Sequence, residues 1–334
     1  MDQTNFRYTI IVPTYNRLDE LQELISSIEK FDFPKERFEL LVTDDGSQDG
    51  TEVYFKEKQF SFPLRYIRQE NAGPSEARNF GMKNAHGDYF IFTDSDCIIP
   101  PDYLRKIDQH LAQNPLDAFG GPDDSHPDFP PFLKAVNFAL TSFLGTGGTR
   151  GGSDKAVTKF YPRSFNLGIH RKVFETIGGM QLRWGEDIDF AIRIYQAGFK
   201  VGLIKEAFVY HKRRTNLKQF YRQVFNWGKA RINLSKMYPD TLKLIHLAPA
   251  IIVLGVILVT VLALLFSWAK WLFILMLAGM TLVALLAFLQ SFAQNKSLKV
   301  ALLSIVTLFT QVFAYGIGSW SGILRVLQGK PAYH

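Results

Sequence analysis

The amino-acid sequence predicts an α/β domain with a mostly parallel sheet, followed by transmembrane helices. Two observations support this prediction. In the first part of the 334-residue chain, β-rich runs alternate with helical patterns, which is the order of a parallel sheet covered by helices on both faces. Residues 241–334, by contrast, carry six basic residues and no acidic residue, and they contain long apolar stretches.

The predicted strands and helices follow one another closely. The strands are residues 8–12, 38–43, 64–67 and 89–93, and the helices are residues 18–28, 73–84 and 101–111. We expect Ser75 to cap the second of these helices. Because ligands of such sheets bind beyond the carboxyl ends of the strands, the polar clusters after the first, second and fourth strands are expected to form one binding site.

The charge of the chain is distributed unevenly. Residues 1–204 have a net charge of −6, residues 205–240 of +7 and residues 241–334 of +6. An acidic body with a basic neck beside apolar segments argues against a nucleic-acid binder, and it is typical of a protein held at the cytoplasmic face of a membrane. The single cysteine, Cys97, excludes an internal disulfide and a cysteine-based zinc site, which favours a reducing compartment.

Three apolar stretches, residues 244–266, 271–292 and 300–320, each reach the ~20 residues needed to cross a bilayer. The basic neck predicts a cytoplasmic catalytic domain and a multi-pass protein of the inner, cytoplasmic membrane. Three full spans would place Arg325 and Lys330 outside, against the positive-inside rule. The sequence therefore does not decide whether the third stretch spans the membrane, forms a re-entrant segment or lies at the interface.

Residues 217–237 are predicted to form an amphipathic helix lying along the membrane. Its aromatic residues Phe220, Tyr221, Phe225 and Trp227 would then meet lipid. Packing of this helix against the catalytic domain is the alternative.

Five motifs carry a family resemblance. They are VPTYNR (12–17), DDGSQDGT (44–51), NAGPSEARN (71–79), DSDC (94–97) and GGMQLRWGEDIDFAIR (178–193). In this order and spacing, over roughly residues 8–215, the chain resembles the family 2 glycosyltransferases. The resemblance implies a GT-A fold, a nucleotide-sugar donor and an inverting mechanism.

Asp94, Ser95 and Asp96 follow an apolar strand and are predicted to contribute to the donor site. A divalent cation held by carboxylates neutralises the charge of a departing diphosphate, and oxygen ligands suit Mn²⁺ or Mg²⁺. The resemblance implies that Asp96 and His211 are metal ligands and that Asp94 lies nearer the ribose and diphosphate. The alternatives are a solvated acidic turn and a histidine without a metal.

The nucleotide is expected to contact residues that follow the first two strands. The resemblance implies that Asp45 accepts a hydrogen bond from the uracil imide, with a simple turn-forming role as the alternative. Pro13 and Tyr15 would frame the base. Arg78 resembles an arginine that accompanies the nucleotide in related sites, and an exposed helix arginine is its alternative.

Glu186 and Asp187 are the predicted catalytic pair. Inversion requires a carboxylate that removes a proton from the acceptor hydroxyl, and the resemblance assigns this role to Asp187. Glu186 would orient the acceptor or set the pKa of the base. A plain helix-capping pair is the alternative for Glu186 and Asp187. On the acceptor side, Trp184 would stack on a sugar ring, and Asn166 would line the acceptor pocket or tie down its own loop.

The sequence thus predicts a catalytic domain at residues 1–215, an interfacial neck at 216–240 and a membrane anchor at 241–334. The predicted protein is a metal-dependent hexosyltransferase that moves a sugar from a nucleotide-sugar to an acceptor. The resemblance implies a UDP-sugar, because this is the commonest donor in the family. The acceptor would be a membrane lipid or a lipid-linked saccharide, used in surface polysaccharide or glycolipid assembly.

Two other functions remain open from the sequence. Processive polysaccharide synthases carry a Q-x-x-R-W motif, of which Gln219 and Arg222 are present while Gln223 replaces the tryptophan. A catalytically inactive nucleotide-sugar-binding scaffold is the other alternative, and the presence of the predicted catalytic and metal-binding carboxylates argues against it.

Overall fold

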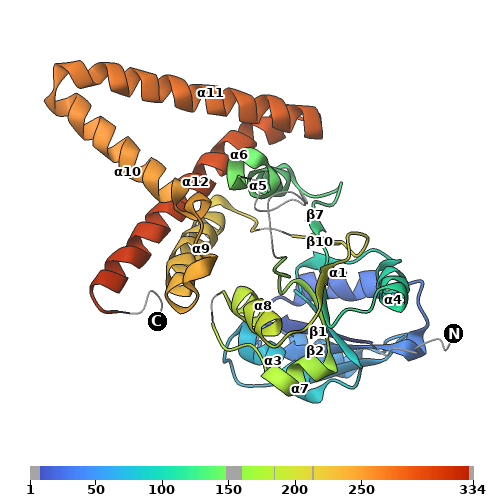
Figure 1. Ribbon diagram of the computed structural model, residues 1–334. Coiled ribbons are helices and arrows are strands. Elements are labelled where there is room, and N and C mark those ends of the chain that lie inside the picture. The colour runs from blue at the N-terminus through green and yellow to red at the C-terminus, as the bar shows by residue number, and fades with distance from the viewer. Residues whose placement is uncertain (1–7, 148–159, 184, 213, 331–334) are drawn as a thin grey trace. The chain divides into compact units, whose positions relative to one another are not determined.

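The computed structural model describes residues 8–147, 160–183, 185–212 and 214–330. These residues form two compact units, shown in Figure 1. Residues 8–126 and 160–212 make up the catalytic unit, and residues 127–147 and 214–330 make up the helical unit. Trp184 lies outside the described residues.

A seven-stranded sheet forms the centre of the catalytic unit. Its strands are β1 (Tyr8–Thr14), β2 (Phe38–Asp44), β3 (Leu64–Arg68), β4 (Tyr89–Thr93), β6 (Ala118–Gly120), β8 (Asn166–His170) and β9 (Val201–Leu203). Their order is β3-β2-β1-β4-β8-β6-β9, with β3, β2, β1 and β4 parallel and β8 antiparallel to both β4 and β6. The predicted mostly parallel α/β fold is confirmed.

The strand order places a crevice at the end of β1. The chain runs outward from β1 through β2 to β3, and it then returns to add β4 on the other side of β1. The connections that follow β1 and β4 therefore leave the sheet in opposite directions. Such a reversal opens a ligand-binding crevice beyond the carboxyl ends of the two strands.

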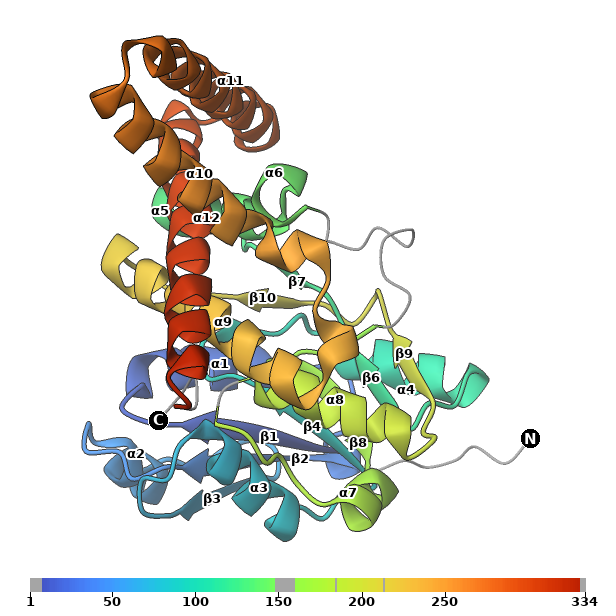
Figure 2. The same ribbon diagram turned by 60° about the vertical axis from the view of Figure 1, so that its left-hand side comes forward.

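Helices cover both faces of this sheet, as Figure 2 shows. They are α1 (Leu18–Ile28), α2 (Thr51–Glu57), α3 (Pro74–Asn84), α4 (Tyr103–Gln113), α7 (Arg171–Ile177) and α8 (Glu186–Gln196). Alternation along β1 separates the two cores, because successive side chains of a strand point to opposite faces. Ile10 packs in the cluster that contains residues of α1 and α4, whereas Ile11 packs with residues of α3, α7 and α8.

The predicted helix at residues 73–84 is present, but its cap differs from the prediction. Gly73, with φ +98°, is the N-cap of α3, and Pro74 occupies the first turn. The Ser75 hydroxyl instead donates a hydrogen bond to the carbonyl of Leu182 at 2.7 Å. Ser75 therefore ties α3 to the segment that leads into α8, and the capping prediction was wrong.

A second sheet of three short strands lies in the same unit. It consists of β5 (Cys97–Ile98), β10 (Val209–His211) and β7 (Asp123–Asp124), in the order β5-β10-β7. β10 runs antiparallel to β5, and this register sets His211 opposite Cys97. Two segments more than 100 residues apart in the chain are thereby brought together immediately after β4.

The helical unit contains a small apolar core of its own. Its helices are α5 (Pro131–Thr141), α6 (Phe143–Thr146), α9 (Leu217–Met237), α10 (Leu244–Leu265), α11 (Lys270–Asn295) and α12 (Leu298–Leu327). Val136 and Leu140 of α5, Phe220 and Val224 of α9, and Ala314 of α12 pack together. Residues 127–147 therefore belong to the same unit as the C-terminal helices. The domain boundaries predicted from the sequence had included them in a catalytic domain at residues 1–215.

The amphipathic helix α9 has the predicted bounds, but one of its aromatic residues faces the protein. Phe220 is fully buried in the core shared with α5 and α12, so its predicted contact with lipid was wrong. Phe225 and Trp227 pack partly against the same core, while Tyr221 is 39% exposed. An apolar face of α9 is thus covered by α5 and α12.

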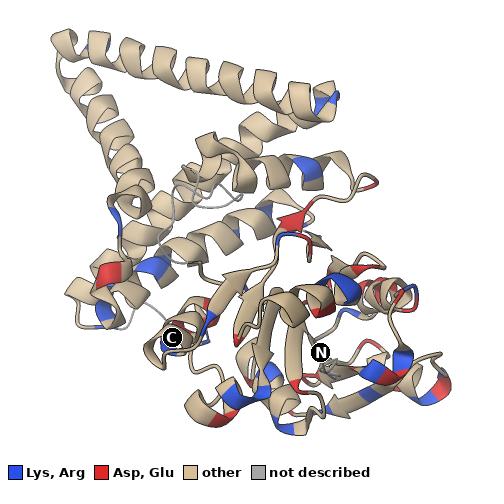
Figure 3. Cartoon of the chain, turned by 45° about the vertical axis from the view of Figure 1, so that its right-hand side comes forward, with Lys and Arg blue, Asp and Glu red and all other residues tan. Residues whose placement is uncertain are grey.

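Within the described residues, three helices are long and apolar enough to cross a membrane, namely α10, the segment Ser267–Asn295 that contains α11, and α12. Figure 3 shows α10 and α11 free of charged side chains along most of their length. The most apolar window is only 11% buried in α10 and 6% buried in the α11 segment, but 44% buried in α12. The third helix therefore differs in its surroundings from the first two.

Candidate active site

The acidic cluster after β4 lies at the crevice beside β1. Ser95 and Asp96 are buried, and the amide of Cys97 closes the turn by donating to the carbonyl of Asp94 at 3.1 Å. Arg17, which follows β1, donates from Nη1 to Asp96 Oδ2 at 2.7 Å. The pairing of β1 with β4 explains this contact, because their carboxyl ends are neighbours.

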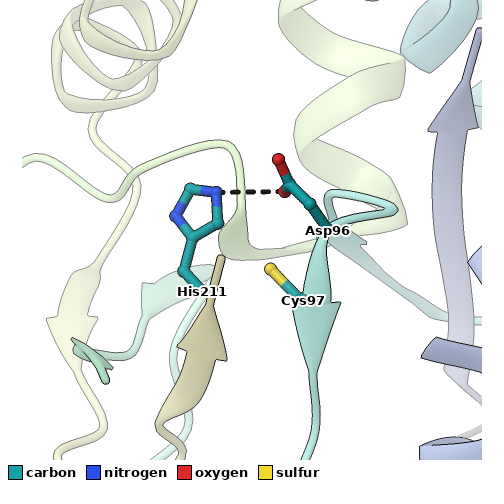
Figure 4. Close-up of side chains that lie close together, drawn as sticks. All are labelled: Asp96, Cys97 and His211. Atoms are coloured by element: carbon teal, nitrogen blue, oxygen red, sulfur yellow. Dashed lines mark ion pairs between the residues drawn. The ribbon is translucent and has the colours of Figure 1, made fainter. Parts of the chain in front are cut away.

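His211 reaches the same carboxylate from the second sheet. Its Nε2 lies 3.1 Å from Asp96 Oδ1, as Figure 4 shows, and the amide of Lys212 donates to the carbonyl of Asp96 at 2.8 Å. Ligand atoms of Asp96, Cys97 and His211 all lie within 4.8 Å of one another. The structure thus brings the two predicted metal ligands together through the pairing of β5 with β10.

The donor set fits a hard divalent cation. A carboxylate oxygen and an imidazole nitrogen meet in a buried position, and His211 Nδ1 is buried without a hydrogen-bond partner among the residues that the structure describes. Burial raises the pKa of the Cys97 thiol well above its ordinary value, and sulfur is a soft ligand that Mn²⁺ and Mg²⁺ disfavour relative to oxygen. Asp96 and His211 are therefore the residues suited to hold such an ion.

Arg78 connects this cluster to the predicted catalytic pair. It is 3% exposed, so the alternative of an exposed helix arginine was wrong. Its Nη2 donates to Asp94 Oδ1 at 2.6 Å, and its Nη1 lies 3.6 Å from Glu186 Oε1. Nε and Nη1 are buried without a hydrogen-bond partner in the described part of the chain, so the guanidinium keeps donors for a ligand.

Glu186 and Asp187 form the first turn of α8, which begins after Gly185 with φ +75°. The Ser164 hydroxyl lies 3.4 Å from Glu186 Oε1, and Arg163 Nη1 lies 3.3 Å from Asp187 Oδ2. Burial, and next the charge of Asp187, raise the pKa of Glu186 from 4.5 to about 7, against the opposing effect of Arg78. Glu186 therefore retains a proton well above the pH at which an exposed glutamate loses it.

Asp45 is buried and organises the loop that leads into α3. Its Oδ1 accepts hydrogen bonds from Gln69 Nε2 at 2.7 Å and from the amide of Ala72 at 2.9 Å, and its Oδ2 accepts from the amide of Gly73 at 2.8 Å. These bonds fit the turn-forming alternative, in which the carboxylate shapes the site through the Gln69 side chain and the backbone amides of Ala72 and Gly73.

Pro13 and Tyr15 lie at the carboxyl end of β1, on the same edge as Asp45. Pro13 pairs with Thr43 of β2, and the Tyr15 side chain is 47% exposed just beyond the strand. An exposed aromatic ring at the end of a central strand is available for stacking on a flat ligand.

Asn166 is buried at the start of β8, and its amide is occupied by the protein. Oδ1 accepts from the Tyr103 hydroxyl at 2.6 Å, while Nδ2 donates to the carbonyls of Ala207 at 2.8 Å and Pro122 at 3.2 Å. These contacts fit the alternative in which Asn166 ties down its surroundings. They hold the segment before β10, and hence help to place His211.

The sequence pattern indicated no role for Arg17 or Arg163. Arg17 contacts the predicted metal ligand Asp96, and Arg163 contacts the predicted general base Asp187. A signal for Arg17 was present, since it ends the first motif and follows the central strand. Arg163 carries no such signal, because its contact with Asp187 depends on the fold of the segment before β8.

Comparison with known proteins agrees with this architecture. A sequence model of glycosyl transferase family 2 matches residues 9–178, and a model described as glycosyl transferase family group 2 matches residues 154–289. An uncharacterized glycosyltransferase of Haemophilus influenzae is 28% identical over 251 residues, which cover 70% of this chain and 78% of that protein.

Two solved structures share the fold at 20% sequence identity. Mannosyltransferase PcManGT from Pyrobaculum calidifontis, in complex with GDP-Man and Mn²⁺, has a TM-score of 0.58 and the match covers 96% of this chain and 88% of that one. Residues 1–349 of TarS from Staphylococcus aureus, in complex with UDP-GlcNAc, have a TM-score of 0.50, with 97% and 92% covered. The predicted GT-A fold is therefore confirmed.

The family model spans half of the chain and includes the strands that carry the acidic clusters at residues 44–45 and 94–96. The clusters lie at the crevice where this fold binds its ligands. The chain therefore belongs to glycosyl transferase family 2.

Proposed function

We propose that this protein is a membrane-anchored, metal-dependent, inverting hexosyltransferase. It transfers a sugar from a nucleotide-sugar, a UDP-sugar, to a lipid-linked saccharide or another lipid acceptor presented at the cytoplasmic face of the membrane, in surface polysaccharide or glycolipid assembly. The observation that carries the proposal is the position of Arg78, which contacts Asp94 and lies within 3.6 Å of Glu186. Arg78 thereby links the acidic cluster at residues 94–96 to Glu186, which supports one site for the donor and the catalytic pair.

The donor half of the proposed site consists of Asp94, Asp96, His211 and Arg17. A divalent cation, when bound by Asp96 and His211, would neutralise the negative charge that develops on the nucleoside diphosphate leaving group. Arg17 already pairs with Asp96, so its guanidinium lies where a phosphate oxygen would find a positive charge. Asp94, held by Arg78, orients the ribose and diphosphate.

The catalytic half uses Asp187 as the general base. Asp187 removes the proton from the acceptor hydroxyl, the hydroxyl oxygen forms a bond to the anomeric carbon, and the bond to the diphosphate breaks on the opposite face of the sugar. This sequence inverts the anomeric configuration. Arg163 orients the carboxylate of Asp187, and a protonated Glu186 avoids a second negative charge beside the base.

The nucleotide base is proposed to bind beyond β1 and β2. Tyr15 and Pro13 frame the base, and Asp45 completes the donor side together with Ser95 of the acidic cluster that follows β4. The UDP-GlcNAc complex of TarS supports a uridine nucleotide, whereas PcManGT was solved with GDP-Man, so both nucleotides belong in any test. On the acceptor side we propose that Trp184 stacks on a sugar ring and that Asn166 shapes the adjoining segment.

The proposed membrane location rests on the apolar helices and on the basic residues that precede them. We propose an inner-membrane, multi-pass protein whose catalytic unit faces the cytoplasm. The long exposed apolar surfaces of α10 and α11 support insertion into a bilayer, because a water-soluble protein rarely exposes apolar patches of this extent.

The test is nucleotide release by detergent-purified full-length protein, measured for UDP-, GDP- and dTDP-sugars. Membrane lipid extract serves as acceptor, and each reaction is run with Mn²⁺, with Mg²⁺ and with a chelator. Asp187→Asn is the catalytic variant, and Asp19→Asn, an exposed aspartate of α1, is the matched control.

We expect nucleotide release from one donor, and this release should require both the metal and the lipid extract. It should persist in Asp19→Asn and be lost in Asp187→Asn. Binding of a nucleotide-sugar without any turnover would favour an inactive scaffold. Absence of both binding and turnover across the panel would refute the proposed function.

A further inference from the structure

Helix α12 contacts the other two apolar helices at widely separated points. The start of α10 meets the C-terminal half of α12, where Trp320 Nε1 donates to the carbonyl of Ala250 at 2.9 Å. The end of α11 meets the N-terminal half, where the hydroxyls of Ser291 and Ser304 lie 2.7 Å apart. Ser304 and Trp320 are separated by about 24 Å along the axis of α12, at ~1.5 Å per residue.

The opposite ends of α10 and α11 meet in a short turn at residues 266–269. The three helices therefore make a triangle with α12 as its base, as Figures 1 and 2 show. The turn is exposed, with Trp268 at 61% and Trp271 at 72%. At ~1.5 Å per residue, the 22-residue α10 is about 33 Å long and the 26-residue α11 about 39 Å, so each is long enough to cross a hydrocarbon core of about 30 Å.

This geometry constrains α12 once α10 and α11 cross a bilayer as a hairpin. The start of α10 and the end of α11 then lie on the same side of the membrane. Because α12 is in contact with both of these ends, Ser304 and Trp320 lie at one membrane level. The helix between them must run along the membrane surface, since a spanning helix would change its depth by about 24 Å over that distance.

The two faces of α12 are correspondingly different. A Cβ on Gly316 would lie 2.4 Å from the carbonyl oxygen of Pro249 in α10, and a Cβ on Gly318 would lie 2.0 Å from that of Phe225 in α9. These glycines are two residues apart and hence about 200° apart around the helix, at ~3.6 residues per turn. Helix α10 therefore leaves α12 on the side opposite α9.

Helix α5 contacts the N-terminal half of α12, where Thr307 donates a hydrogen bond from its hydroxyl to the carbonyl of Ala135 at 2.9 Å. On the other side, α12 exposes a row of apolar residues at helical spacing. They are Leu298, Leu302, Val306, Ile317 and Leu324. This row is an uncovered apolar surface on the side that contacts α10. Ser304, which contacts α11, is two residues from both Leu302 and Val306 and hence about 200° from them around the helix.

The positions of the basic residues indicate that both ends of α12 lie on the same side of the membrane. Lys296 and Lys299 lie at its start, and Arg325 lies near its end. Arg325 is close enough to Lys229 of α9 to help lower the pKa of that lysine, for which burial is the larger cause. Lys270 alone lies at the turn between α10 and α11. Three full spans would separate Arg325 from the basic residues that the positive-inside rule keeps together.

We propose that only α10 and α11 cross the membrane and that α12 lies in the plane of the cytoplasmic leaflet, with its row of exposed apolar residues against the lipid. The proposal rests on the membrane anchoring given under Proposed function. It assigns α9 and α5 to the water-facing side of α12.

Cysteine labelling tests the topology in the full-length chain. Native Cys97 is buried and the chain has no other cysteine, so the unchanged protein gives the background of labelling. A new cysteine is introduced by Ser267→Cys, in the turn, or by Gln328→Cys, after α12, and the labelling of each variant is compared with this background. Both positions are exposed. Spheroplasts are treated with a membrane-impermeant maleimide before and after permeabilisation, and carbonate extraction shows whether the protein is membrane-inserted.

We expect Ser267→Cys to be labelled in intact spheroplasts and Gln328→Cys only after permeabilisation. Labelling of Gln328→Cys in intact spheroplasts would overturn the proposal, because α12 would then cross. Failure of Ser267→Cys to label until permeabilisation would also overturn it. Release of the protein into the soluble fraction by carbonate would instead refute the membrane anchoring itself.

Spin-label depth measurements in lipid vesicles test the orientation of α12 directly. Labels at Leu302, Val306, Ile317 and Leu324 should report similar depths. Labels at Leu254, Leu258 and Val261 of α10 should report depths that change steadily along the helix. A steady change of depth along α12 would overturn the proposal.

Discussion

The burial of Arg78 predicts a large and specific loss of stability when its charge is removed. Arg78→Met keeps most of the aliphatic stem but leaves Asp94 without its 2.6 Å partner and Glu186 without its nearest cation. Breaking a buried ion pair by removing one partner costs about 3–5 kcal/mol, and this range is an upper bound here because the Asp94 side chain is 30% exposed. For a domain of about 150–250 residues, at ~2–4 °C per kcal/mol, this corresponds to a fall in Tm of about 6–20 °C.

The chain supplies its own probe and control for this measurement. Cys97 is buried in the catalytic unit and is the single cysteine, so a thiol-reactive dye reports the thermal unfolding of that unit in detergent. Arg105→Met is the control, because Arg105 pairs with Asp32 at 2.9 Å and Asp102 at 3.8 Å while remaining exposed. Exposed pairs contribute about 0–1 kcal/mol. Equal, small shifts of Tm in the two variants would refute the reasoning.

Further predictions concern the catalytic and donor residues. Asp187→Asn should lower turnover by ~10²–10⁴-fold, the usual contribution of a general base, with donor affinity retained by calorimetry; a parallel loss of affinity would contradict the division of roles. Asp96→Ala should abolish the Mn²⁺ dependence of donor binding, and unchanged dependence would remove Asp96 from the metal site. Asp45→Ala should weaken UDP binding and speed amide hydrogen exchange at Ala72 and Gly73, whereas normal exchange would argue against the two hydrogen bonds that these amides donate to Asp45. Because the pKa of Glu186 is raised to about 7, the folded protein holds a proton that the unfolded chain releases from about pH 4.5, so stability should fall as the pH rises through this window. Glu186→Gln should flatten that fall in unfolding followed by circular dichroism, and an unchanged profile would contradict the shifted pKa.

Much of the local structure followed from short-range patterns. Helix α1 and helix α9 have the bounds that the sequence predicts, and the strands β1 to β4 agree within two residues. Hydrophobic periodicity and propensity act over a few residues, so they determine which segments are strands and helices. The acidic motifs were also placed correctly at the carboxyl ends of strands, because the alternating order of strands and helices requires a parallel sheet there.

The predictions that were wrong concerned burial and long-range contacts. Phe220 was assigned to lipid because an amphipathic pattern shows that one face is apolar, but not what covers it. The covering helix α5 is about 80 residues away in sequence, and α12 is nearly 100 residues away on the other side. Similarly, nothing in the local pattern around Arg78 distinguishes an exposed arginine from one buried between two carboxylates.

By itself, the sequence determined the family, the order of the strands and helices up to about residue 111, and the three apolar segments, because these depend on motifs and on patterns within single segments. The tertiary structure alone decided that His211 meets Asp96, that Arg78 lies between Asp94 and Glu186, and that α12 packs against α5 and α9. Each of these contacts joins residues from separate elements whose meeting depends on strand register or helix packing. Such contacts form only when the whole chain has folded, and the chemistry of the site depends on them.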